Sequence, residues 1–336
     1  MTLEFGLLLP HFGGQADARA IVRRAARAES LGFASLWVRD HLFLGAPAGG
    51  DGGSLDFLEA LTVLTAVGTA TETVRLGTAA LVPLRHPLYT ALVAATMSRF
   101  LGPRLVFGVG GGSTEKEFAA LGLAGTSRID LLLANMAIMR RAWTGETFSW
   151  SDPPFSFADV AIHPVPAQGS IPFWYCGDTP RAARLAAEHC EGWLPGRITL
   201  ETIRARIALM DETSRRIGRR RPVAGVAALT SIARTRREAE DAIDIGPLLR
   251  TANAERFWVR PASGEFESRA DLEGMLICGA PEDVVGQVQR LERAGVEHVV
   301  FDFRLGFDRW DEQMELVGRE VLPAFAGTGS THQPGR

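Results

Sequence analysis

The sequence predicts an α/β fold, a (β/α)8 TIM barrel, from three observations. Residues 74–109 have the pattern strand, helix, strand, and strands joined by one helix run parallel because parallel pairs need a crossover of that length. The alternation recurs, with eight strands expected near residues 3, 35, 74, 104, 171, 192, 223 and 298. A length of 336 residues suits one such barrel. A doubly wound sheet is the competing architecture, but the GxGxxG turn typical of its first strand is absent.

The expected elements follow from local pattern. Residues 3–10 form a near-continuous apolar run, as in a strand buried on both faces. The other strands are expected at 35–39, 74–81, 104–109, 171–176, 192–194, 223–232 and 298–303. Apolar residues at helical spacing predict helices at 18–31, 58–70, 87–100, 128–143, 180–189, 200–217, from 236, 281–294 and 308–325. Gly32 follows the first helix as a C-cap, and Pro180 begins another helix.

Two stretches interrupt this alternation. Residues 144–170 are rich in Pro, Ser and aromatic side chains, and we expect a hairpin there. Residues 245–276 have an irregular, mixed composition, and so long an irregular stretch is usually functional, so we expect a lid that closes over the site. A rigid insertion is the alternative. Residues 1–326 are expected to form one barrel domain, and 327–336 a flexible C-terminal tail.

Composition limits the function. The chain is 46% apolar and 22% charged, as in soluble globular proteins, and its net charge of −3 argues against nucleic-acid binding. A signal peptide and a membrane span are not evident, so a cytoplasmic protein without a membrane partner is expected. Cys176, Cys190 and Cys278 form no CxxC pair, so we expect neither a disulfide framework nor a metal site. Lys116 is the only lysine, which argues against Schiff-base catalysis.

The best candidate for acid–base chemistry is Asp40-His41, at the end of the second expected strand. Barrel active sites form where the strands end, and a carboxylate beside an imidazole can set its tautomer. His41 is therefore a candidate proton donor or acceptor, with Asp40 as its partner. The alternative is an Asp that caps a turn beside an exposed His. For His11 and His86 we expect packing or loop roles.

A second group of candidates would bind an anion. The segment 176–180 joins a strand to a helix N-terminus, where free N–H groups and the helix dipole favour a phosphate. The alternative is an ordinary helix start capped by Asp178 or Thr179. We expect the Asp178 carboxylate to point away from the anion and cap the helix. Together with a glycine cluster after the fourth strand, the segment predicts a phosphate-bearing cofactor held by backbone groups of Gly110, Gly111, Gly112, Ser113, Gly177, Asp178 and Thr179.

Several segments together resemble the bacterial-luciferase-like flavin and deazaflavin oxidoreductases, over roughly residues 3–325. They are WVRDH (37–41), LVPLRHP (81–87), RLVFGVGGG (104–112), a basic helix start at Arg128, WYCGDTPRAARLAAEHCEGWLP (174–195) and GAPEDVVGQVQRLERAGVEHVVF (279–301). The resemblance implies a barrel that binds coenzyme F420 or FMN at its C-terminal mouth. It also implies a bulge at the third strand end, often with a non-prolyl cis peptide, and a cofactor ring over Thr78, Ala79 and Ala80.

The resemblance further implies that His41 lies near the reactive carbon of the cofactor. The chain departs from many deazaflavin-dependent relatives just after GVG, where it has Gly111-Gly112-Ser113 in place of an acidic or bulky aromatic residue. Glu115 and Glu117 come later in the chain, so the general acid is not assigned.

Three functions are compared. The Asp40-His41 pair favours an F420-dependent oxidoreductase that transfers a hydride to or from a small organic substrate. The alternative is an FMNH2-dependent monooxygenase that inserts oxygen from O2. A non-catalytic flavin-binding barrel is the third, and the intact glycine and anion-site segments count against it. The apolar insertions indicate an organic substrate with apolar surface, and a homodimer is compatible with the sequence.

Overall fold

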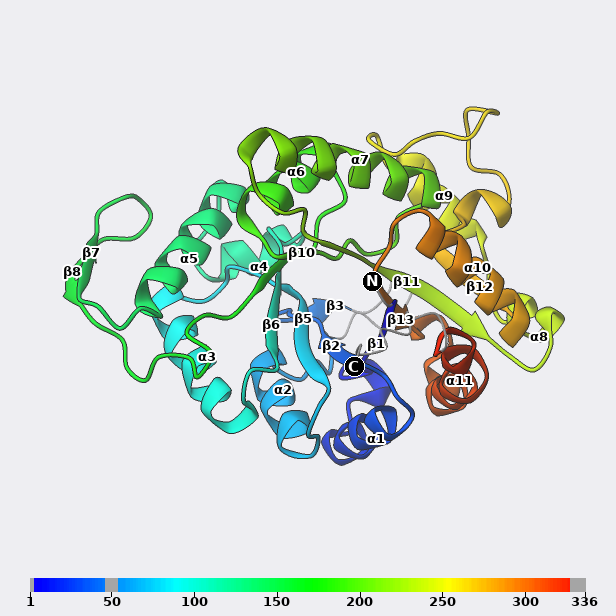
Figure 1. Ribbon diagram of the computed structural model, residues 1–336, viewed down its shortest axis with the longest axis horizontal. Coiled ribbons are helices and arrows are strands. Elements are labelled where there is room, and N and C mark those ends of the chain that lie inside the picture. Colours follow the sequence, from blue (N-terminus) through cyan, green and yellow to red (C-terminus); the bar gives the residue numbers. More distant parts are fainter. Residues whose placement is uncertain (1–2, 46–53, 327–336) are drawn as a thin grey trace, which may run out of the picture. The chain divides into compact units, whose positions relative to one another are not determined.

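The computed structural model describes residues 3–45 and 54–326. The (β/α)8 fold class is confirmed, because all eight expected strands are present and alternate with helices (Figure 1). Short apolar runs formed these strands as expected. They are β1 (Glu4–Leu8), β2 (Ser35–Val38), β5 (Arg75–Leu81), β6 (Leu105–Val109), β9 (Phe173–Tyr175), β10 (Gly192–Trp193), β11 (Val223–Ile232) and β13 (His298–Asp302).

The helices follow the expected order, and α6 and α7 match the expected bounds. They are α1 (Ala18–Ser30), α2 (Ala60–Thr69), α3 (Pro87–Leu101), α4 (Glu115–Ala120), α5 (Arg128–Ala142), α6 (Pro180–His189), α7 (Leu200–Ile217), α8 (Arg236–Asp241), α9 (Gly246–Ala254), α10 (Pro281–Arg293) and α11 (Trp310–Leu316). The expected last helix is divided, because the short helical turns η3 (Arg304–Arg309), η4 (Val317–Val321) and η5 (Leu322–Phe325) flank α11. Helices α4 and α9 were not expected.

Contacts divide the described residues into two compact units. The first contains residues 9–26 and 35–177, with parallel strands in the order β2, β5, β6, β9. Trp37 on β2 packs against Trp174 on β9, with ring centroids 5.5 Å apart. Gly77 leaves room for the Trp37 ring, since a Cβ at position 77 would lie 2.3 Å from the Trp37 side chain. The core of this unit thus packs β2 closely against β5.

The second unit contains the residues before 9, residues 27–34 and those from 178 onward. Its longest strand is β11, which pairs first with β13 and then with a strand that was not expected, β12 (Leu276–Gly279). The register places Gly225 opposite His298 and Leu229 opposite Leu276. A ten-residue strand can serve two parallel partners in succession, which explains the additional strand.

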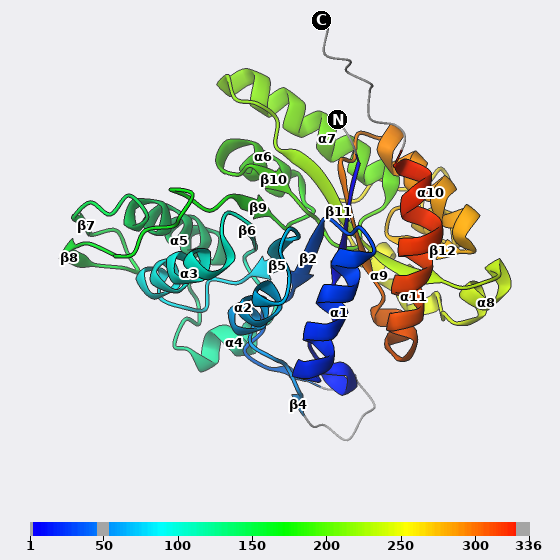
Figure 2. The same ribbon diagram turned by 60° about the horizontal axis from the view of Figure 1, so that its bottom comes forward.

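The hairpin expected in residues 144–170 is confirmed as β7 (Phe148–Trp150) paired antiparallel with β8 (Phe157–Val160). Within the first unit it lies on the far side of α5 from β6 in both ribbon views (Figures 1 and 2). A second small antiparallel pair, β3 (Leu44–Gly45) with β4 (Ser54–Leu55), was not expected.

Residues 245–276 are not irregular throughout, so that part of the prediction is wrong. They contain α9 and the short turn η2 (Ala270–Leu272), and they end as β12 begins. Pro247 lies in the first turn of α9, where a proline is tolerated, and Leu248 and Ala252 bury one helical face. Closure of this segment as a lid stays a prediction. The single domain at 1–326 also stays a prediction, and the tail 327–336 lies outside the described residues.

Candidate functional site

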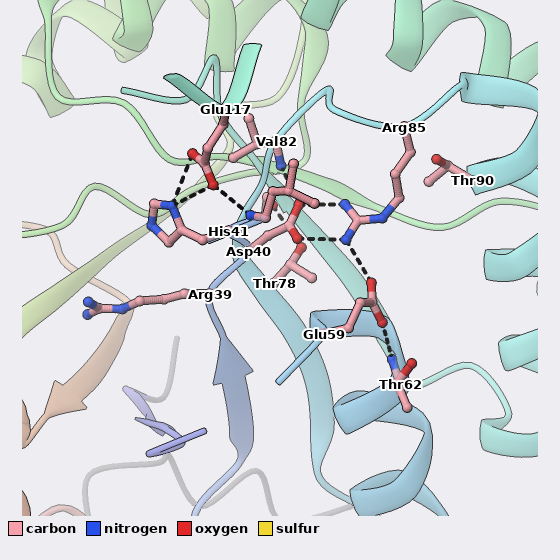
Figure 3. Close-up of polar contacts among 12 residues, drawn as sticks. Arg39, Asp40, His41, Glu59, Thr62, Thr78, Val82, Arg85, Thr90 and Glu117 are labelled. Carbon is pink, nitrogen blue, oxygen red and sulfur yellow. Dashed lines mark hydrogen bonds and ion pairs between the residues drawn. The ribbon is translucent and has the colours of Figure 1, made fainter. Parts of the chain in front are cut away.

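Asp40 and His41 follow β2, but they face different partners. Asp40 is buried, with 2% of its surface exposed. Its carboxylate accepts two hydrogen bonds from Arg85, at 2.7 and 2.8 Å, and one from the Val82 N–H at 3.0 Å (Figure 3). Figure 3 shows the two side chains pointing to opposite sides, Asp40 toward Arg85 and His41 toward Glu117. The expectation that Asp40 sets the His41 tautomer is therefore wrong.

Arg85 extends this contact to the next helix. Its Nη2 donates to Glu59 Oε1 at 2.7 Å, and Glu59 Oε2 accepts from the N–H of Thr62 at 2.7 Å, which caps α2. Burial lowers the pKa of Arg85, but its bonds to Asp40 and the two negative charges outweigh burial and leave the pKa raised. The guanidinium is thus held charged between the end of β2 and the start of α2.

The carboxylate that contacts His41 belongs to Glu117 on α4. Both Glu117 oxygens lie 3.3 Å from His41 Nδ1, and Oε1 also accepts from the N–H of Leu42 at 2.6 Å (Figure 3). The Phe57 ring meets the His41 ring edge to face, with centroids 5.3 Å apart. Sequence reasoning noted Glu117 only as a late carboxylate, because a six-residue helix after a glycine cluster gives no sign of which side is buried.

The end of β5 has the bulge that the resemblance implied. Its register against β6 shifts between Thr78 and Leu81, and the Ala79–Ala80 peptide bond is cis. The hydroxyl of Thr78 donates to Gly108 O at 2.8 Å. The N–H of Gly110 donates to Leu81 O at 3.2 Å, and a Cβ on Gly110 would lie 3.0 Å from the Ala80 Cβ. The result is a surface of small residues that a flat ring could cover.

The glycine loop after β6 offers backbone donors. In the described parts of the chain, the N–H groups of Gly111, Gly112 and Ser113 have no acceptor. Gly112 has φ +76° and a Cβ there would lie 2.6 Å from Val82, so this position requires glycine. Arg128 Nη1 donates to Gly112 O at 3.1 Å. The Arg128 guanidinium also pairs with Glu115. Free backbone N–H groups can donate to a phosphate, so this loop stays a candidate anion site.

Gly177 ends the first unit, and Asp178 and Thr179 begin the long segment of the second. The Thr179 hydroxyl accepts from the Ala182 N–H at 3.1 Å and caps α6, while the Asp178 carboxylate accepts from Trp258 Nε1 at 2.9 Å. The expectation that Asp178 caps the helix is wrong, because Pro180 at the first helical position leaves the cap position to Thr179. A phosphate shared with Gly110–Ser113 stays a prediction.

The other candidate residues have structural roles. His11 is buried, with each ring nitrogen 3.0 Å from a carbonyl oxygen, of Leu9 and of Arg39, and burial lowers its pKa. His86 accepts from the Leu88 N–H at the start of α3. The packing and loop roles expected for these two are confirmed. Among the described residues, no group of His, Cys, Asp and Glu is arranged to hold a metal ion. No described helix is long and apolar enough to cross a bilayer.

Comparison with known proteins places the chain in a family. A family model for luciferase-like monooxygenase matches residues 3–298. The chain is 28% identical to the F420-dependent glucose-6-phosphate dehydrogenase of Rhodococcus erythropolis, over 94% of this chain and 96% of that protein.

Solved structures share the fold. One is the coenzyme F420-dependent tetrahydromethanopterin reductase of Methanopyrus kandleri, with a TM-score of 0.77, 21% identity, and coverage of 97% of this chain and 100% of that one. Another is the oxygenating constituent of 3,6-diketocamphane monooxygenase from Pseudomonas putida in complex with FMN, with a TM-score of 0.77, 18% identity, and coverage of 96% and 99%. Because the family model spans most of its length, the chain belongs to the luciferase-like monooxygenase family.

Proposed function

We propose that this chain is a coenzyme F420-dependent oxidoreductase that transfers a hydride to or from a small organic substrate. The observation that carries the proposal lies in the first unit, where His41 is held by the buried Glu117 carboxylate. The same unit contains the small-residue surface of Ala79, Ala80 and Gly110, next to the buried Thr78. A full-length relative named as an F420-dependent dehydrogenase supports the choice of cofactor.

In this proposal each group of residues has one task. The backbone at Ala79, Ala80 and Gly110 would hold the ring, and the N–H groups of Gly111–Ser113 would bind phosphate. A phosphate contact at Gly177, Asp178 and Thr179 stays a separate proposal. F420, when bound, supplies a ring carbon that accepts or donates a hydride. His41 accepts or donates the accompanying proton at Nε2. Phe57 shields one side of the imidazole from water.

The substrate class and the cellular location are also proposed. The relative's name specifies glucose 6-phosphate, and for this chain we propose a small organic substrate. We also propose that the protein is cytoplasmic and binds no nucleic acid. An FMN-dependent monooxygenase is the alternative, because an FMN complex shares the fold.

We further propose that two copies of the chain associate through α2 and α3. Helix α2 contains no charged residue, and the neighbouring helix α3 exposes Tyr89 and Phe100, with 64% and 68% of their surfaces accessible. Large apolar side chains this exposed on adjacent, nearly uncharged helices are typical of a protein interface. A second copy offers the same uncharged surface and buries both aromatic side chains.

The cofactor test is a titration with F420 and, separately, with FMN, followed by cofactor fluorescence and by binding heat. We expect F420 to bind more tightly. Gly110→Ala places a methyl group on the proposed ring surface, 3.0 Å from the Ala80 Cβ, and should weaken F420 binding by about tenfold or more. Gly286→Ala, on α10, is the matched control and should bind normally.

Two outcomes would contradict the proposal. Tighter binding of FMN than of F420 would favour the monooxygenase. Unchanged F420 affinity in Gly110→Ala would place the ring elsewhere.

A further inference from the structure

We infer that Glu117 is a positioning residue that fixes the tautomer of His41, with the proton on Nδ1 and the lone pair on Nε2. The inference rests on the proposed function for the role of His41 in proton transfer. The geometry itself is independent of any cofactor, since it involves only Glu117, His41 and the backbone that follows.

The contact geometry selects the tautomer. His41 Nδ1 lies 3.3 Å from each Glu117 oxygen, so the ring nitrogen faces both acceptor atoms of the carboxylate. A carboxylate accepts hydrogen bonds, and a neutral imidazole has one N–H and one bare nitrogen. With the lone pair on Nδ1, three electron-rich atoms would face one another. With the proton on Nδ1, the contact is a hydrogen bond shared by two oxygens.

Burial of the Glu117 carboxylate strengthens the preference for the tautomer with the proton on Nδ1. Glu117 has 1% of its surface exposed, and its hydrogen-bond partners among the described residues carry no permanent positive charge. A buried carboxylate needs donors, and here these are the N–H groups of Leu42 and Phe43, at 2.6 and 3.4 Å, and Nδ1 of His41. Loss of the His41 donor would leave one carboxylate oxygen with a single alternative, water, at a site that is almost closed to solvent.

The remaining ring nitrogen is available for chemistry. The His41 side chain is 22% exposed, and Nε2 has no hydrogen-bond partner within the described ranges 3–45 and 54–326. Phe57 packs against the ring at 83°, which restricts its rotation. A neutral His41 held this way presents Nε2 as a proton acceptor toward substrate.

Glu117 also connects His41 to the glycine loop. It lies on α4, which begins three residues after Gly112, so the segment that binds cofactor phosphate in the proposed function also carries the carboxylate that orients His41. Asp40 cannot take this role, because Arg85 and Val82 occupy its carboxylate. The competing explanation is that Glu117 only fastens the backbone of Leu42 and Phe43.

Imidazole nitrogen NMR separates these explanations. Protein labelled with ¹⁵N-histidine is measured without cofactor, at a pH where the His41 ring is neutral, and the His41 signals are assigned by their loss in His41→Gln. We expect the wild-type ring to show a protonated Nδ1 and a bare Nε2. This measurement requires no Glu117 variant, and a wild-type ring protonated on Nε2 would overturn the inference.

Variants test the cause. Glu117→Gln keeps the size and an oxygen acceptor for Leu42 but adds an amide donor, so we expect the Nδ1–H form to lose its dominance and the two tautomers to mix. Glu146→Gln removes one charge from an exposed side chain of the same unit and should leave the His41 signals unchanged. An unaltered tautomer in folded Glu117→Gln would show that the carboxylate only fastens the backbone.

F420 titration of the same variants separates this inference from the proposed function. We expect the dissociation constant of Glu117→Gln to stay within about threefold of wild type, because the Glu117 carboxylate is buried against His41 and the backbone of Leu42 and Phe43. A large loss of affinity with an unchanged tautomer would overturn the positioning role. Failure of wild type to bind F420 would refute the proposed function and leave the tautomer result to decide the inference.

Discussion

Replacing Arg85 by Gln tests how the end of β2 is held. The substitution removes two of the three hydrogen bonds to the Asp40 carboxylate and leaves that carboxylate buried with only the Val82 N–H. Removing one partner of a buried ion pair costs about 3–5 kcal/mol. The Arg85 side chain is 24% exposed, so water can partly replace it, and we expect about 3 kcal/mol.

The assay is urea unfolding followed by fluorescence, with thermal unfolding as a second measure. For a chain of 336 residues, a loss of about 3 kcal/mol corresponds to a fall in Tm of roughly 4 °C. Arg99→Gln removes an exposed guanidinium from the last turn of α3 and should change stability by less than about 0.5 kcal/mol.

The double variant tests the reason for the loss. Adding Asp40→Asn to Arg85→Gln removes the unpaired buried charge, so the double variant should be more stable than the sum of the single losses predicts. Strict additivity, or an Arg85→Gln protein within about 1 kcal/mol of wild type, would show that the buried charge does not depend on this arginine.

Two further predictions concern the lid and the assembly. Trp258→Phe removes the donor to the Asp178 carboxylate and should speed hydrogen exchange across residues 255–268. Trp150→Phe, which removes a donor to the backbone carbonyl of the exposed Asp152, should not. Slow exchange in both variants, unaffected by F420, would argue for a rigid insertion. The double variant Tyr89→Ser with Phe100→Ser should convert a dimer to a monomer in sedimentation. The control Phe257→Ser, which replaces a side chain that is 59% exposed, should not. A dimer that persists in the double variant would place the interface elsewhere.

The strands could be predicted because burial on both faces leaves a simple pattern. Runs such as residues 3–10 and 223–232 are apolar almost throughout, and the alternation with helices then specifies the fold class. Strand β12 was missed because its four residues, LICG, follow a polar stretch and depend on the second half of β11 for pairing. Helix α9 was missed because Gly246 and Pro247 look like breakers, although a proline suits the first turn.

The sequence predicted which residues lie at the site, but it did not predict which residues contact one another there. Strand ends indicated Asp40, His41, Thr78 and Gly110, since the fold class brings such ends to one face. The partner of His41 could not be predicted, because residues adjacent in sequence point apart, while Glu117 comes from a helix seventy-six residues later. Its burial depends on how α4 packs against the backbone after His41, and periodicity in a six-residue helix does not specify that.

Two buried carboxylates, those of Asp40 and Glu117, hold different parts of the structure around His41. Asp40 joins the end of β2 to the backbone after the β5 bulge through Val82, and to α2 through Arg85 and Glu59. Glu117 holds the backbone just after His41 and contacts the ring itself. A displacement of about 1 Å can cost about 10²-fold in rate, so contacts that fix the backbone on both sides of His41 would support proton transfer. Changes at Asp40 should therefore act through stability, and changes at Glu117 through the position of a proton.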